Sequence, residues 1–104
     1  PGYVYAVTNP AWPGWVKVGM AVDSQDRLNS YQTGSPLRDY ELLCDFKSED
    51  KTADERKAHM LLREVASEFR GEWFKVDTSV AYTLVTDLAK LPNLLQSPEQ
   101  EPCS

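Results

Sequence analysis

Two ionisable residues interrupt the apolar face of a helix predicted near the middle of the chain. Apolar residues recur at helical spacing over residues 52–69, and extending this spacing toward the N-terminus leads to His59 and then to Glu55. A carboxylate on a buried face is costly unless it is paired, hydrogen-bonded or bound to a cation. A buried histidine beside a carboxylate is also a common structural device, so a structural and a chemical interpretation both stay open.

The N-terminal third of the chain supplies phenols, an amine and a guanidinium. Tyr5 precedes Lys17, Arg27 follows Lys17 by ten residues, and Tyr31 lies four residues beyond Arg27, on the same face of a predicted helix. Taken singly, each has an ordinary explanation: a half-buried strand aromatic, a solvated lysine, and a surface cation–π or salt-bridged pair. The set as a whole is more informative than its members.

The elements that must position these side chains begin with a hairpin. Residues 3–8 and 16–20 are rich in β-branched and aromatic residues, which predicts two strands. The prolines and glycine of residues 9–15 turn the chain between them. Asp23 is a good N-cap, and a helix is predicted from there to near Gly34.

The rest of the chain predicts a strand over residues 40–46, the helix over 52–69, an extended segment over 71–76 and a last helix over 78–90. Trp73 and Phe74 are expected in the core. Pro92 is expected to end the last helix. The apolar face of that helix is predicted to be formed by four residues, namely Val80, Leu84, Leu88 and Leu91.

These elements predict an α+β fold in which helices flank a small antiparallel sheet of three or four strands. We expect residues 1–76 to form the core, residues 77–92 to pack on it as a C-terminal helix, and residues 93–104 to be a tail.

Composition predicts a single domain with a modest core. The chain has 104 residues, of which 41% are hydrophobic and 26% charged. No apolar run approaches the length that crosses a bilayer, so we expect no membrane partner and a cytoplasmic location, in a bacterium or a phage-infected host. Cys44 and Cys103 have no metal-binding spacing, and both thiols are expected to be free.

The net charge of −5 is low for a protein that binds nucleic acid. Four acidic residues and one basic residue in positions 76–104 account for −3 of this charge, which leaves positions 1–75 nearly balanced. Any DNA binding by the chain alone is therefore expected to be weak, roughly micromolar at best, so that a further DNA-binding domain or a protein partner is expected.

The order of these motifs resembles the GIY-YIG nuclease superfamily. Tyr3-Val4-Tyr5 stands for its first strand motif and Lys17-Val18-Gly19 for its second, with Arg27 and Tyr31 on the following helix. Glu55 and His59 follow on a later helix, and Gly71-Glu72-Trp73-Phe74 matches a GEWF-like stretch. The similarity covers residues 2 to 76 and is closest to a branch common in bacteriophages, whose second motif reads Lys-Ile-Gly.

The resemblance implies a metal-dependent endonuclease that hydrolyses DNA phosphodiester bonds. Glu55 would hold Mg²⁺, or Mn²⁺, and one carboxylate suits Mg²⁺ because this ion keeps most of its waters. Arg27 would bind the phosphate, while Tyr5, Tyr31 or His59 would orient or deprotonate water, with Lys17 close enough to adjust their pKa. The expected base is a coupled Tyr5–Lys17 pair, with His59 as the competing base. Two further residues, Tyr3 and Glu72, are candidates for contacts to the substrate or to these side chains.

The chain departs from the superfamily at three positions. Lys17 replaces the second-strand tyrosine, Met20 replaces a polar residue, and Ser67 stands where many relatives have asparagine. Two other functions therefore stay open. One is a module of the same fold that binds DNA or a protein without cleavage, and the other is a structural protein in which Glu55 and His59 only stabilise the core.

Overall fold

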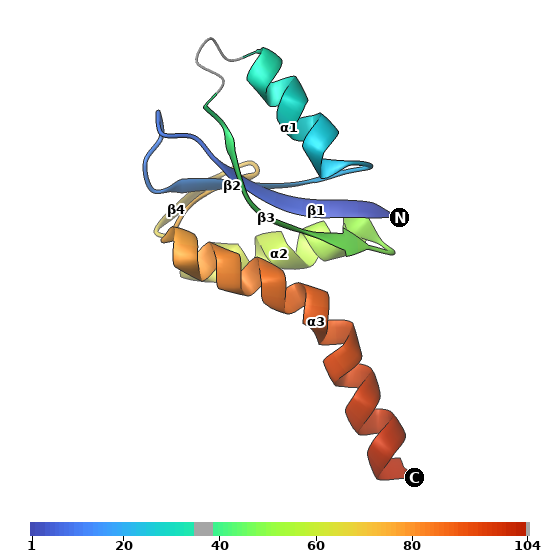
Figure 1. The fold of residues 1–104 in the computed structure, drawn as a ribbon. Coiled ribbons are helices and arrows are strands. Elements are labelled where there is room, and N and C mark those ends of the chain that lie inside the picture. The colour runs from blue at the N-terminus through green and yellow to red at the C-terminus, as the bar shows by residue number, and fades with distance from the viewer. Residues whose placement is uncertain (35–38, 104) are drawn as a thin grey trace.

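The computed structural model describes the backbone of residues 1–34 and 39–103 and the side chains through residue 90. Figure 1 shows a sheet with α1 on one face and α2 and α3 on the other. The strands are antiparallel in the order β3-β1-β2-β5-β4. Their bounds are β1 Gly2–Thr8, β2 Trp15–Ala21, β3 Glu41–Ser48, β4 Glu68–Arg70 and β5 Trp73–Lys75, and the helices are α1 Ser24–Thr33, α2 Lys51–Val65 and α3 Thr78–Cys103. The predicted α+β fold with a small antiparallel sheet is confirmed.

The two faces of β1 belong to two different cores. Val4 and Ala6 are fully buried in the larger core, which includes residues of α2 and α3. Tyr5 and Val7 point to the other face, where Leu28 of α1 packs against them. Strand β1, which lies inside the sheet between β3 and β2, is therefore buried on both sides, and its odd-numbered residues face α1.

Helix α1 begins as the sequence predicts. The side chain of Asp23 accepts a hydrogen bond from the backbone N–H of Asp26 at 3.0 Å, which satisfies one of the unpaired donors of the first turn. The helix ends at Thr33, with Gly34 as its C-cap. Leu28 and Tyr31 are its partly buried contributions to the core.

Helix α2 is shorter than predicted, and the prediction that it reaches Phe69 is wrong. It ends at Val65, because Ala66 is extended (φ −74°, ψ 142°) and Ser67 N–H bonds to the Lys75 carbonyl at 3.0 Å. Residues 68–75 then form a hairpin whose turn contains Gly71 at φ 57°, a conformation that favours glycine. This hairpin raises the number of strands from the expected three or four to five.

The buried stripe of helix α3 overlaps only in part with the predicted one, since Leu88 is buried and Leu84 partly buried as predicted. Ala81, Val85 and Leu88 are buried, whereas Val80 is 39% exposed, because the helix packs on a 4-3 spacing that begins one residue later. The helix also continues past Pro92 and leaves the body of the molecule (Figure 1). A proline inside a helix removes one hydrogen bond and clashes with the preceding turn, at a cost of about 3 kcal/mol. The helix nevertheless continues through Pro92, so the predicted end is wrong. The side chains of Leu91 and Cys103 lie outside the described residues.

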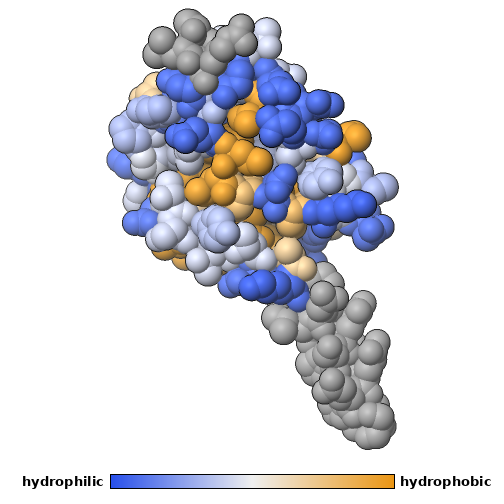
Figure 2. All heavy atoms as spheres, in the orientation of Figure 1, coloured by the Kyte–Doolittle hydropathy of each residue, from blue (hydrophilic) through white to orange (hydrophobic). Residues whose placement is uncertain are grey.

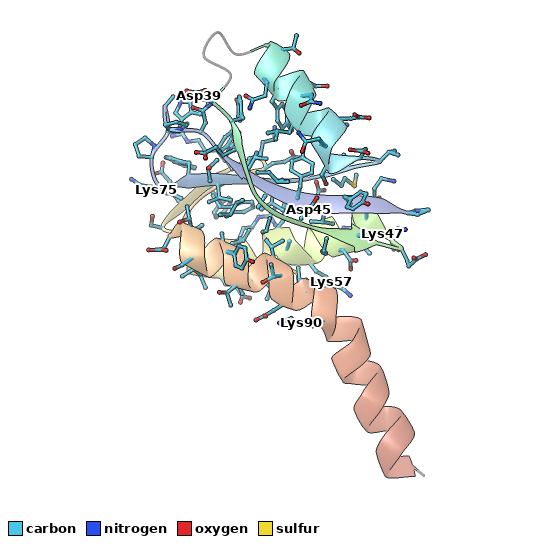
Figure 3. The ribbon with its side chains drawn as sticks, in the orientation of Figure 1. Asp39, Asp45, Lys47, Lys57, Lys75 and Lys90 are labelled. Carbon is cyan, nitrogen blue, oxygen red and sulfur yellow. The ribbon has the colours of Figure 1, made fainter. Side chains whose placement is uncertain are left out.

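Strand β3 forms one open edge of the sheet. Exposed Asp45 and Lys47 lie along it (Figure 3), as is common on strands that must avoid pairing with other chains. The face of the molecule in Figure 2 has apolar side chains gathered in its middle, with hydrophilic ones around them.

Burial raises the pKa of the half-buried Cys44 thiol to about 11. No helix in the described part of the chain is long and apolar enough to span a membrane.

Candidate functional site

A pair of phenols joins the sheet to α1. The register pairs Tyr5 with Gly19 of β2, and the Tyr5 ring lies over this glycine. A β-carbon at position 19 would lie 2.5 Å from the Tyr5 hydroxyl, so only glycine leaves room for the ring. The Tyr5 hydroxyl, in turn, is 2.6 Å from the hydroxyl of Tyr31. The absence of a side chain at Gly19 therefore lets the Tyr5 ring lie close to the sheet, where its hydroxyl meets that of Tyr31.

Lys17 lies beside this pair but does not face Tyr5. The register places Lys17 opposite Val7, and its Nζ is 5.0 Å from the centroid of the Tyr31 ring. The same Nζ is 3.7 Å from a carboxylate oxygen of Glu72, in an ion pair that solvent reaches. The expectation that Lys17 adjusts the ionisation of Tyr5 therefore gains no support from the strand register.

Burial raises the pKa of Tyr5 well above the ordinary value for tyrosine, and its hydrogen bond with Tyr31 adds to this effect. The positive charge of Arg27, an exposed residue of α1, acts in the opposite direction. Arg27 is therefore close enough to influence the phenol electrostatically, but Tyr5 stays protonated at neutral pH. Tyr3 is half-buried on the same face of β1 and pairs with Ala21.

Glu55 and His59 lie together on α2, beside the edge of β2. Strand β5 pairs with β2 only as far as Lys17. His59 Nε2 lies 2.8 Å from the carbonyl oxygen of Val18, the next residue along β2. Because a carbonyl only accepts, Nε2 must carry the hydrogen and donate it. Nδ1 is then the atom of the neutral ring that can take up a proton.

The carboxylate of Glu55 has an unusual environment. Its Oε2 atom is buried and has no hydrogen-bond partner among the described residues. Burial raises the pKa of Glu55, His59 opposes this, and the negative charge of Glu72 adds to it. Glu55 and His59 also line a hollow of about 390 Å³, so solvent reaches the pair. A cation with vacant coordination positions would suit such an oxygen.

The predicted site residues thus form two neighbouring groups. Tyr5, Tyr31 and Lys17 lie on the face of the sheet that α1 covers, and Arg27 is on α1 itself. Glu55 and His59 lie on α2, which covers the opposite face, beside β2. Glu72 links the groups, because it pairs with Lys17 and its charge acts on both Tyr5 and Glu55. Among the residues whose side chains are described, no three His, Cys, Asp or Glu are grouped as metal ligands.

Sequence reasoning missed an aromatic hollow next to this site. It measures about 370 Å³, and it is lined by five residues from two loops, the start of β2 and the β4–β5 hairpin: Trp12, Trp15, Tyr40, Arg70 and Trp73. Trp73 was expected in the core, but only Phe74 is fully buried. The signal available in the sequence was the presence of two tryptophans in a turn rich in proline and glycine.

Comparison with known proteins identifies the family of the chain. Residues 2–89 match the T5orf172 domain, a phage-associated domain related to GIY-YIG-like and HNH-like nuclease modules. Comparison with curated proteins and with solved structures gave no match. The matched range includes all the candidate site residues and every strand of the sheet. The chain therefore belongs to the T5orf172 domain family.

Proposed function

We propose that this domain is a metal-dependent endonuclease that hydrolyses phosphodiester bonds in DNA. The observation that carries the proposal is the Glu55 carboxylate, which has a buried oxygen without a hydrogen-bond partner and lines a hollow together with His59. Membership of a nuclease-associated family supports the same function. Arg27 and Lys17 supply the positive charge that binding of a phosphate requires.

Glu55 would hold Mg²⁺ or Mn²⁺ through its unpartnered oxygen. A single carboxylate is sufficient for Mg²⁺, which keeps several waters and completes its shell with oxygens of the substrate phosphate. The metal ion, when bound, would stabilise negative charge on the scissile phosphate and the leaving oxygen. The raised pKa of Glu55 means that burial destabilises the charged carboxylate in the metal-free protein, and a bound cation would offset this cost.

The phenols act in this proposal as hydrogen-bond donors. Tyr5 remains protonated because burial raises its pKa, so it holds Tyr31 in place through their 2.6 Å hydrogen bond. Tyr31 is the more exposed of the two, and its ring lies under the Lys17 ammonium. The Tyr31 hydroxyl and the Lys17 ammonium together would orient a phosphate oxygen or the attacking water, while Arg27 binds the phosphate from α1.

We assign the general base to His59 rather than to the Tyr5–Lys17 pair. The hydrogen bond to Val18 fixes the ring and leaves Nδ1 to accept the proton of a water molecule in the hollow shared with Glu55. A buried phenol with a raised pKa is a poorer base at neutral pH.

Cleavage of circular DNA tests the proposal. Wild-type protein is incubated with supercoiled plasmid and with circular single-stranded DNA, in Mg²⁺, in Mn²⁺ and in chelator. We expect nicked or linear products only with metal, and a loss of about 100-fold or more in Arg27→Ala, the typical cost of removing one phosphate-stabilising donor. Lys47→Ala, on the open edge strand β3, is the matched control and should cleave normally.

A binding module without cleavage is the second candidate, and the acidic net charge of −5 together with the Lys17–Glu72 ion pair favours it. Glu72 offsets part of the positive charge that the phosphate would need. Metal-independent DNA binding with no product under any of these conditions would establish this alternative instead.

A further inference from the structure

We propose that the aromatic hollow receives an unpaired nucleobase, so that the substrate is single-stranded DNA or DNA with an unpaired nucleotide at the cleavage site. This inference rests on the proposed function, because it names the form of nucleic acid that the same site would take. It concerns Trp12, Trp15, Tyr40, Arg70 and Trp73, which line the hollow.

The rings of the hollow remain open to solvent instead of closing on one another. Trp12 packs edge-on against Trp73, with centroids 5.5 Å apart and planes at 65°, and lies 6.3 Å from the Tyr40 ring. Nevertheless, Trp12 is 48% exposed and a volume of about 370 Å³ stays between the side chains. All three tryptophans of the chain contribute to this small volume.

The simplest alternative is that these rings only hold the loop between β1 and β2. Backbone hydrogen bonds already do so: Trp12 N–H bonds to Asn9, Trp15 N–H to Trp12, and Val76 N–H to the Gly14 carbonyl, at 2.9 to 3.1 Å. The buried Asn9 side chain adds a bond from Ala11 N–H and one to Asp39. The loop is thus fixed by its backbone, which leaves the exposed ring faces to be explained.

The hollow has the size and the lining that suit a nucleobase. Its volume is at the lower end of the range for sites that bind small ligands. Flat aromatic faces stack on any base with little dependence on sequence. The Arg70 side chain is 80% exposed at the rim, where it pairs with Glu68 at 3.6 Å and its planar guanidinium can stack on the base.

The hollow is also continuous with the proposed phosphate site. Lys17 Nζ lies 6.0 Å from the Trp73 ring centroid, and the Tyr40 ring lies 5.2 Å from that of Tyr31. Two walls of the hollow therefore adjoin the Lys17–Tyr31 pair directly. A base seated between them would have its own phosphate beside Lys17. A base stacked within a duplex cannot reach this position unless it leaves the helix, which favours an unpaired nucleotide.

Tryptophan fluorescence in chelator tests binding without cleavage. A short oligothymidylate, a matched duplex, and the duplex with one unpaired 2-aminopurine are titrated into wild-type protein, Trp12→Ala, Trp12→Phe and Tyr82→Ala. Tyr82 is the control because it is an equally exposed aromatic, at 49%, on α3. We expect the single strand and the unpaired 2-aminopurine to bind more tightly than the matched duplex. Trp12→Ala should weaken this binding about tenfold, which is about 1.4 kcal/mol, while Trp12→Phe retains most of it and Tyr82→Ala all of it.

Equal binding by Trp12→Ala and Tyr82→Ala, or duplex binding as tight as that of the single strand, would overturn the inference. So would a proline-rich peptide that binds this hollow without competition from the oligonucleotide, since aromatic grooves also take such peptides. If Trp12→Ala does not fold by circular dichroism, Arg70→Ala against Lys47→Ala makes the same comparison. Base stacking without DNA cleavage would contradict the proposed nuclease activity but support the nucleobase site. Cleavage of every DNA form at the same rate by Trp12→Ala and wild type would support the nuclease activity but contradict the nucleobase site.

Discussion

The hydroxyl groups of Tyr5 and Tyr31 lie 2.6 Å apart and connect strand β1 to helix α1. Tyr5 is only 2% exposed, so its hydroxyl depends on Tyr31 for a partner, whereas the half-buried Tyr31 also reaches the Lys17 ammonium. The pair therefore fixes the position of Tyr31, which would contact a phosphate, relative to β1. A substitution that displaces Tyr5 should displace Tyr31 as well.

Gly19→Ala tests this dependence most simply. The added β-carbon would lie 2.5 Å from the Tyr5 hydroxyl and 2.8 Å from its ring, so Tyr5 must move away from Tyr31. We expect a loss of about 1–3 kcal/mol in the free energy of unfolding, measured with urea, and a loss of cleavage. Gly34→Ala, where the nearest atom is 3.8 Å away and φ is −85°, should be neutral or slightly stabilising. Equal stability of the two variants would contradict the packing described here.

The raised pKa of Tyr5 predicts a specific loss of stability in alkali. A phenol whose pKa is higher in the folded state binds its proton more tightly there, so its stabilising contribution is present at neutral pH and is lost as pH rises above the ordinary value of 10.0. The melting temperature of wild type should fall more steeply above pH 10 than that of Tyr5→Phe. Parallel curves for the two proteins would show that Tyr5 ionises normally.

Glu55→Gln should leave the metal-free protein at neutral pH as stable as wild type, or more so. Burial raises the pKa of Glu55, so the folded state favours the protonated acid, and stability is lost as pH rises from the ordinary value of 4.5 through the raised one. Glutamine removes this cost. If Glu55 instead stabilises the fold by pairing with His59, the variant should lose about 1–3 kcal/mol. Thermal melts at several pH values, with Glu64→Gln as the exposed control on the same helix, separate the two outcomes.

The Lys17–Glu72 ion pair predicts opposite effects on DNA binding. Lys17→Met should weaken binding and lower the slope of log affinity against log salt by about one, because one phosphate contact is lost. Glu72→Gln should strengthen binding, since it frees the Lys17 ammonium from a carboxylate 3.7 Å away. The pair itself is worth little stability, about 1 kcal/mol or less, so both variants should fold. Fluorescence anisotropy at several salt concentrations measures these effects, and changes in the same direction would be incompatible with competition for Lys17.

The identity of the base follows from a comparison of pH–rate profiles. His59→Asn should remove the acid limb of the profile, because Nδ1 can no longer accept the proton, while Lys17→Met should lower the rate without moving that limb. A basic limb that moves upward in Lys17→Met, with the acid limb intact in His59→Asn, would return the role to the Tyr5–Lys17 pair.

Local signals predicted the part of the site that lies on regular elements. The Asp23 cap and the turn before β2 are encoded by adjacent residues, and the spacing of Glu55 and His59 places them on one side of α2. The end of α2 was not predictable in this way, because no glycine or proline stands between Val65 and Gly71. There the pairing of β4 with β5 outweighs helix propensity, which is a tertiary effect.

The aromatic hollow could not be predicted from the sequence for a related reason. Trp12 and Tyr40 are 28 positions apart, and Trp73 follows 33 positions later, so no periodicity connects them. They meet because β3, β2 and β5 bring their ends to the same side of the sheet. Figure 3 shows Asp39 and Lys75, near the ends of these strands, beside the loop between β1 and β2. The hollow forms because the strand order places β5 next to β2, which brings Trp73 close to Trp12 and Tyr40.

The most direct test of the proposed metal-dependent nuclease compares DNA cleavage with DNA binding in Glu55→Gln and Glu64→Gln. Both changes remove one carboxylate from α2, but only Glu55 has a buried, unpartnered oxygen in the hollow with His59. We expect both variants to bind a short oligonucleotide like wild type and only Glu55→Gln to lose Mg²⁺-dependent cleavage. Cleavage by Glu55→Gln at the rate of Glu64→Gln would contradict the proposal.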